Sequence, residues 1–268
     1  MLTSFMVRTL IALILVLAFF AGLGALGWHF VKEQIYLRPE YRLQAERIVV
    51  SPPPDWIPDQ FVEEVLRTSG LNRTGSLLDK ALPQKLAEAF IAYPWIERVE
   101  QVVLRHPSGA EVKLVYRVPV ALVEIPQRGI VPVDRNGIVL PPEYLTDADA
   151  DLRDKLLLIQ GIQSLPLGAV GTPWGDPQVQ TAAQLAEALT DVAEHLNLAK
   201  ITPAMEAMLT GTRIACRLQT VAGTAFYWGA FTPDDPRTET KKKRLLDLHE
   251  QFRSLDNVPE RFRDLGRE

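Results

Sequence analysis

The fold is decided by residues 76–125, SLLDKALPQKLAEAFIAYPWIERVEQVVLRHPSGAEVKLVYRVPVALVEI. The first half has apolar residues at the spacing of one helix face, namely Leu78, Leu82, Leu86 and Phe90. Pro83 must lie in the first turn of that helix or kink it. The second half alternates apolar and polar residues on either side of a turn at residues 106–109. We therefore expect a helix followed by strands at residues 99–104 and 111–116.

A short strand and another helix are predicted upstream of this segment. Residues 41–50, YRLQAERIVV, contain strand formers, and the prolines that follow Ser51 end the strand. Residues 59–66 place apolar side chains at helical spacing, and Gly70 provides a stop. Together with the downstream segment, this order predicts a β-α-α-β-β domain over residues 43–118.

A second mixed region is expected to form another domain over residues 119–255, followed by a tail at residues 256–268. Asp176 and Pro177 have the residue types that cap and begin a helix. Strands are expected at residues 131–133, 138–140, 206–209, 212–218 and 224–228, with a turn at residues 134–137 and helices at residues 177–196 and 239–255. The pattern predicts the α+β class.

The N-terminal region predicts a membrane anchor. Residues 9–31 carry no charge, and as a helix they would span about 35 Å, slightly more than the roughly 30 Å of bilayer hydrocarbon. We expect one transmembrane helix after a cytoplasmic tail at residues 1–8. The membrane-anchoring residues would be Leu10, Leu13, Leu17, Phe20 and Trp28. A cleaved signal peptide is the alternative, because Arg8 precedes the apolar run.

The charges that flank this run do not give a simple orientation. Arg8 stands on one side, and Lys32, Arg38, Arg42 and Arg47 stand on the other. The charge count alone would place the C-terminal side in the cytoplasm, whereas a large domain can be translocated despite its charges. We expect the N-terminus inside and the bulk of the chain outside the cytoplasmic membrane.

The sequence contains few residues in patterns that suggest chemistry. The net charge is −4, and the one basic cluster, residues 241–244, is expected to be a solvated helix start, so no nucleic-acid partner is predicted. Metal-ligand spacing is absent from the four histidines, which are His29, His106, His195 and His249. The acidic run at residues 147–151 lacks the glycine of a calcium loop. Cys216 is alone and is expected to be a packed apolar residue.

No phosphate-binding loop or nucleophile elbow is found in the sequence either. Pairs of carboxylates for glycoside chemistry stay open, because their spacing is spatial and the chain has 33 acidic residues. We expect no catalytic residue, metal, cofactor or small-molecule substrate. This inventory favours a binding or scaffolding role.

The order of motifs along residues 43–255 resembles that of the cell-division FtsQ/DivIB family. That family has a helix that ends in Pro-Trp-(Val/Ile), two strands, and then Arg-x-Pro-Val-Ala. The corresponding segments here are Pro94-Trp95-Ile96, residues 99–105, residues 112–116 and Arg117-Val118-Pro119-Val120-Ala121. Downstream, VPVDRNGIVLP is similar to the family's Val-Asp-x-x-Gly hairpin. LLLIQGI, FYWGAF and KKKRLLDLHEQF are similar to its later segments.

The resemblance implies a POTRA domain followed by a second domain, both periplasmic, in a bacterial divisome protein without enzymatic activity. Its partners would be the membrane and divisome proteins of the FtsB/DivIC and FtsL types, which it would bridge at the septum. Residues that would contact partners are Phe226, Trp228, Arg244 and Leu248. An exposed sheet edge would suffice for such binding, because its unpaired N–H and C=O groups can be completed by an extended partner.

Two features depart from the family pattern. Tyr116 stands where the family often has an acidic residue, and NVPERFRDLGRE leaves little room for the family's final edge strand. Two other functions stay open at this point. One is a membrane-anchored hydrolase of the envelope, and the other is a POTRA-type adaptor for secretion or assembly.

Overall fold

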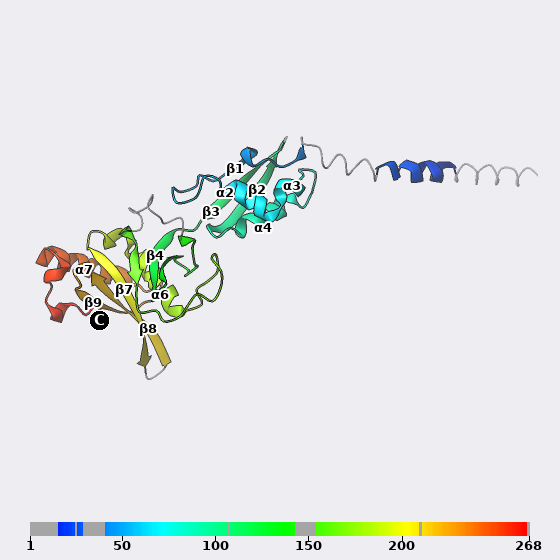
Figure 1. Cartoon of the computed structure of the whole chain (residues 1–268). Helices are drawn as coiled ribbons and strands as arrows, with labels where there is room; N and C mark the ends of the chain where they lie inside the picture. The colour runs from blue at the N-terminus through cyan, green and yellow to red at the C-terminus, as the bar shows by residue number, and fades with distance from the viewer. Residues whose placement is uncertain are drawn as a thin grey trace, which may run out of the picture. The chain divides into compact units, whose positions relative to one another are not determined.

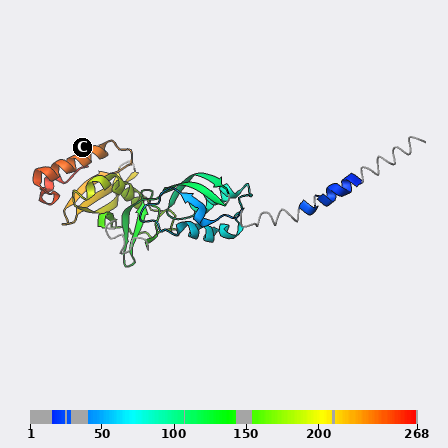
Figure 2. The ribbon, with the colours of Figure 1, turned by 90° about the horizontal axis from the view of Figure 1, so that it is seen from above.

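The computed structural model describes residues 16–24, 26–28, 41–106, 108–142, 154–208 and 211–266. Contacts divide the chain into two compact units, whose elements are drawn in Figures 1 and 2. The first unit comprises Met1–Ser51, Asp59–Phe90 and Val99–Leu114, and the second comprises Pro52–Pro58, Ile91–Arg98 and Val115–Glu268. The division after Leu114 lies close to the predicted boundary, but two short segments that were assigned to the first domain belong to the second unit.

The first unit contains the predicted β-α-α-β-β order and one extra short helix. Its elements are η2 (Ala45–Arg47), β1 (Ile48–Val50), α2 (Phe61–Ser69), α3 (Leu71–Thr74) and most of α4 (Leu82–Ile91), β2 (Ile96–Arg105) and β3 (Gly109–Tyr116). The last residue of α4, the first three residues of β2 and the last two of β3 belong to the second unit. The sheet order is β1-β3-β2, and β1 runs parallel to β3 with Ile48 opposite Ala110.

The apolar stripes of the two longer helices form the core of this unit. Leu82, Leu86 and Phe90 of α4 are fully buried, and the Phe90 ring meets the Phe61 ring of α2 edge to face at 6.4 Å. Pro83 lies in the first turn of α4, as required, because a proline there removes no helical hydrogen bond.

The second unit is a six-stranded mixed sheet packed against α6. Its elements are β4 (Pro119–Ile125), β5 (Gly129–Asp134), β6 (Leu157–Ile159), α6 (Pro177–Ala193), β7 (Leu198–Met208), β8 (Gly211–Thr220), β9 (Ala225–Ala230), α7 (Arg237–Phe252), η5 (Leu255–Asn257) and η6 (Glu260–Phe262). The strand order is β5-β4-β6-β7-β8-β9. β6 is parallel to β4 and β7, and the other neighbours are antiparallel.

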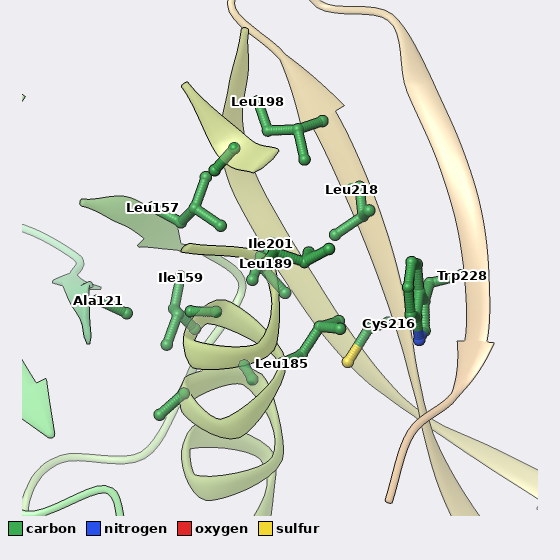
Figure 3. Packing of buried hydrophobic residues seen from close by; sticks show 14 of the residues in the cluster. Ala121, Leu157, Ile159, Leu185, Leu189, Leu198, Ile201, Cys216, Leu218 and Trp228 are labelled. Atoms are coloured by element: carbon green, nitrogen blue, oxygen red, sulfur yellow. The ribbon is translucent and has the colours of Figure 1, made fainter. Parts of the chain in front are cut away.

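The buried face of α6 organises the core of the second unit. Leu185 and Leu189 of the helix lie over Ile159 and Ile201 of the sheet (Figure 3). The helix begins as predicted, with Pro177 at the first position and the Asp176 side chain accepting a hydrogen bond from the Gln178 N–H. The local capping signals were therefore sufficient to place this helix start.

Two predicted strand boundaries were wrong. β7 begins at Leu198, well before the predicted start at residue 206. A proline is a strand breaker in most positions, but Pro203 is tolerated in β7 because it pairs with Cys216 of β8 on one side and lies beyond the end of β6 on the other. Residues 138–140 form isolated bridges and no regular strand, although the predicted turn before them is present, with the Gly137 N–H donating to the Asp134 carbonyl at 2.9 Å. Gly137 has φ of 69°, a region that favours glycine.

The transmembrane part of the predicted fold is contradicted. Within the described ranges, no helix is both long and apolar enough to cross a membrane. Of the expected anchor, residues 16–24 and 26–28 are described as helical, and residues 9–15, 25 and 29–31 lie outside the described residues. The two sheets and their helices agree with the α+β class, but the structure does not support the expected anchor over residues 9–31.

Candidate functional site

The outer edge of β2 is the first candidate surface for binding another polypeptide. β2 is 10 residues long and lies at the end of the β1-β3-β2 sheet. No described strand pairs with the side of β2 that faces away from β3. Arg105 of β2 bonds to Glu111 of β3 and lowers the pKa of that carboxyl group, which ties the inner side of the strand in place. The outer side is thus a regular row of backbone groups that an extended segment can join.

β9 is the last strand of the six-stranded sheet of the second unit, and residues 263–265 cover its outer edge. The Tyr227 N–H donates to the Arg263 carbonyl at 2.9 Å, and the Leu265 N–H donates to the Tyr227 carbonyl at 2.8 Å. Leu265 is fully buried. Residues 263–265 therefore cover this edge of the sheet through an isolated parallel bridge between Tyr227 and Asp264.

A glycine permits this close return of the tail. Gly229 of β9 has φ of 83°, and a Cβ atom at that position would lie 3.2 Å from the Cα of Gly266. Arg263 also donates from Nε to the Val258 carbonyl at 2.8 Å, which holds the segment before the bridge. The tail is thus held on the N-terminal side of its contact with β9.

The residues predicted to contact partners are mostly inside the second unit. Phe226 and Trp228 are fully buried and Leu248 is buried, while Arg244 is half-buried. Figure 3 places Trp228 beside Cys216 in the core. Side chains in these positions stabilise the unit itself in this fold, and their role at an interface stays a prediction.

The predicted anchor residues are placed only in part. Leu17, Phe20 and Trp28 are exposed on the described helical residues, with 62%, 65% and 66% of their surface accessible. Leu10 and Leu13 lie outside the described residues.

The basic cluster at residues 241–244 is only partly solvated, contrary to expectation. The Lys241 Nζ donates to the Trp228 carbonyl at 2.7 Å and lies 5.2 Å from the centre of the Trp228 ring. Lys242 forms ion pairs with Asp191 at 2.9 Å and Glu239 at 3.3 Å. Burial alone would lower the pKa of Lys242, but the hydrogen bonds that it donates to these carboxylates raise the pKa. Both lysines therefore help to attach α7 to the sheet and to α6.

The described residues contain little that could support bond chemistry. Cys216 is buried, and burial raises the pKa of its thiol to about 12, as suits the packed residue predicted there. The ring centres of His195 and His249 lie 4.9 Å apart. The sequence did not predict this contact, because the two residues are 54 positions apart. The described part of the chain has no group of three His, Cys, Asp or Glu residues that could hold a metal ion. The acidic run at residues 147–151 lies outside it.

The second unit contains a cleft of about 740 Å³, and all of its lining residues belong to that unit. Apolar residues line its base, namely Pro119, Val120, Leu157, Ala186 and Ala193. Arg135, which also lines the cleft, pairs with Glu97 at 2.9 Å and with Glu187 at 3.6 Å, and the hydrogen bond that it donates to Glu97 raises the arginine's pKa. Sequence reasoning missed the cleft, because its walls come from distant segments.

Tyr116, the residue that departs from the family pattern, also lines this cleft. Burial raises the pKa of its hydroxyl to about 12, so the group stays neutral at physiological pH. The cleft thus combines an apolar base with a neutral hydroxyl and paired charges, an arrangement suited to holding apolar side chains.

Comparison with known protein families and with curated proteins finds no match to this chain. The fold and its surfaces therefore carry the functional argument.

Proposed function

We propose that this chain is a non-enzymatic scaffold of the bacterial division machinery, which binds extended segments of other division proteins along a sheet edge. The observation that carries the proposal is the 10-residue strand β2 at the open end of the β1-β3-β2 sheet. Its partners are divisome proteins of the FtsB/DivIC and FtsL types, and it acts at the division site.

The placement of the motif residues supports this reading. Trp95 and Ile96, from the Pro-Trp-Ile motif, are fully buried where β2 begins, and the Trp95 carbonyl accepts a hydrogen bond from the Arg117 N–H at 2.8 Å. Arg117, which opens the Arg-Val-Pro-Val-Ala motif, pairs with Asp134 of the Val-Asp-x-x-Gly motif at 2.6 Å. Three motifs that are separate in the sequence thus meet through two contacts.

Strand addition suits a protein with few reactive groups. The added strand gains hydrogen bonds to the backbone, while neighbouring side chains select its sequence and register. On β2 the side chains of Val102, Val103 and Leu104 are half-buried, so an added strand would cover apolar surface and complete the row of backbone bonds.

The proposal is tested by binding of purified FtsB-type and FtsL-type proteins to variants of β2. Adjacent residues of a strand direct their N–H groups to opposite sides, so one of Gln101→Pro and Val102→Pro removes an outward donor and the other removes a bond to β3. We expect the outward variant to remain folded, by circular dichroism, and to lose partner binding. Equal binding by this variant and the unaltered chain would contradict the role of the edge.

Localisation in cells provides the second test. A fluorescent fusion should gather at the septum of dividing cells, and depletion of the protein should block division. An even distribution in dividing cells, together with normal division after depletion, would reject the proposal.

A further inference from the structure

β7 and β8 extend beyond the ends of the strands that pair with them on either side. β6 pairs with β7 only at Lys200 and Ile201, and β9 pairs with β8 only from Ala215 onward. Residues 202–208 and 211–214 consequently form a two-stranded arm, which Figure 1 shows extending beyond the other strands of the second unit. No described strand pairs with either outer side of this arm.

Hydrogen-bond direction shows which backbone groups of the arm are open. The Ile201 carbonyl faces β6, because it accepts a hydrogen bond from the Gln160 N–H at 2.9 Å. Since direction alternates along a strand, Pro203, Met205 and Ala207 also direct their backbone groups away from β8. Pro203 has no N–H group. The open edge of β7 thus offers both backbone groups of the exposed residues Met205 and Ala207, and the carbonyl of buried Pro203 lies at the base of this edge.

The two faces of the arm differ in polarity. Ile201 and Pro203 are buried on the core face, and the next residue on that face, Met205, is 59% exposed opposite half-buried Ile214. The core face of the sheet therefore continues past the core as an uncovered apolar strip.

On the other face of the arm, Glu206 pairs with Arg213 at 3.0 Å and accepts a hydrogen bond from the Tyr227 hydroxyl at 2.7 Å. The hydrogen bonds from Tyr227 and Arg213 lower the pKa of the Glu206 carboxyl group. The polar face is thus satisfied internally, and the apolar strip and the β7 edge are left for a partner.

We propose that the open edge of β7 pairs antiparallel with the same edge of a second copy of this chain, with the two Met205 residues opposite each other on the two-fold axis. The two Met205 residues exchange two hydrogen bonds in this register. Each Ala207 N–H donates to the Pro203 carbonyl of the other copy. Pro203 has no N–H group to return this bond, but it lies at the end of the row of paired residues, so only the terminal hydrogen bond is missing. The apolar strips of the two arms become continuous.

The charges of the arm favour this register. Glu206 lies opposite Ala204 of the other copy, so like charges do not meet. In the register with Met205 opposite Ala207, the two Glu206 residues would face each other, and like charges directly opposite destabilise a sheet. The edge of β8 is less suited to a two-fold pairing of Thr212 with Ile214, because the two Arg213 residues would then lie opposite each other.

The size of the interface predicts a weak dimer. An arm of this length contributes few residue pairs, which places the contact at or below the lower limit of about 1,000 Å² for specific interfaces. We therefore expect dissociation constants of about 1 μM or weaker. This association is independent of the proposed role in cell division, because it uses a different sheet edge.

The dimer is tested by sedimentation velocity of the full chain over a range of concentrations. Ala207→Pro removes an N–H group on the β7 edge and leaves the bonds to β8 intact, so the dimer should be lost while circular dichroism is unchanged. Thr212→Pro is the matched control, because it removes an outward N–H group on the β8 edge of the same arm. It should leave the dimer unchanged. Monomers at every concentration, or equal effects of the two prolines, would overturn the proposal.

The register is tested by cysteine cross-linking. Residues directly opposite in such a pair have Cα atoms about 5.5 Å apart, within the range of a disulfide. Met205→Cys should form a disulfide-linked dimer on mild oxidation, whereas Glu206→Cys should not. Buried Cys216 provides little background, since burial raises the pKa of its thiol to about 12. Faster cross-linking of Glu206→Cys, or a monomer that binds a synthetic Thr-Val repeat peptide at this edge, would refute the pairing.

Discussion

At the scale of single residues, the buried ion pair between Arg117 and Asp134 joins two distant parts of the second unit. Their side chains are only 14% and 3% exposed, and Asp134 also accepts hydrogen bonds from the N–H groups of Asn136 and Ile138. A carboxylate in such a position requires its positive partner, because charge away from water is unfavourable without compensation. The pair therefore supports both the turn after β5 and the entry into β4.

Replacement of Arg117 by alanine should destabilise the second unit by about 3 kcal/mol, since Asp134 would remain buried without its partner. The measurement is urea unfolding followed by Trp fluorescence. Asp134→Asn in the same chain is the control, because it removes the charge and keeps an oxygen for the turn. The double variant should recover part of the loss. A loss below about 1 kcal/mol for Arg117→Ala would show that the pair behaves as an exposed one.

A second prediction concerns Asp235 near the start of α7. The Arg237 guanidinium and N–H bond to its carboxylate, and these hydrogen bonds lower its pKa to about 2. An unfolded Asp titrates near 3.9. Because the folded pKa is the lower one, the stabilisation is complete above about pH 4 and is lost as the pH falls toward 2.

Titration of the Asp235 carboxyl group by NMR should therefore show a midpoint near pH 2. In the Arg237→Gln variant the midpoint should rise toward the ordinary value. The Arg105→Gln variant, which alters a different ion pair, should leave the midpoint of Asp235 unchanged. An Asp235 midpoint near 4 in the unaltered chain would contradict the assignment.

At the scale of elements, the start of α6 depends on Asp176. Its side chain caps the helix by accepting from the Gln178 N–H at 2.8 Å and also accepts from the Ser164 hydroxyl at 2.6 Å. Asp176→Ala should cost about 1 kcal/mol of stability, whereas Asp176→Asn should cost less because it preserves a capping oxygen. Chemical unfolding of both variants distinguishes these outcomes, and equal losses would argue against the cap.

Elements whose signals lie within one short segment could be predicted from the sequence. Asp176, Pro177 and the apolar stripe lie within one segment, so the start of α6 followed from local chemistry. The position of Pro203 in β7 did not, because a proline fits there only where β6 has already ended. The cover over β9 depends on residues 263–265, which are far from β9 in the sequence.

At the scale of the whole molecule, each unit has its own apolar core. Leu86 is fully buried in the first unit, and Leu185 is fully buried in the second. Either leucine, when replaced by alanine, should destabilise its own unit by about 2–5 kcal/mol. Hydrogen exchange followed by mass spectrometry should then show faster exchange in β3 for Leu86→Ala and in β4 for Leu185→Ala. Equal acceleration in both strands for either variant would contradict separate cores.

The sequence predicted the elements of the molecule better than its surfaces. The structure contains the expected β-α-α-β-β order with α3 in addition, and the longer helices were predictable because their apolar residues recur at helical spacing. Phe226 and Trp228 were predicted as contact residues because their segment resembles one of the family's, yet the structure buries them. The cleft was not predicted, because its lining comes from segments that are distant in the sequence. The hairpin arm was not predicted, because it depends on where the neighbouring strands β6 and β9 end.

Pro203 has a consequence for the behaviour of this protein in crowded solution. An edge with donors and acceptors along its full length can recruit strand after strand and grow into a fibril, and a proline at its base limits that growth. In the two-fold pair both β7 edges are consumed, and the Arg213 residues disfavour further pairing through β8, so growth stops at two copies. Pro203→Val would supply the missing donor at each end of the ladder and should strengthen the dimer, which sedimentation at low concentration would show.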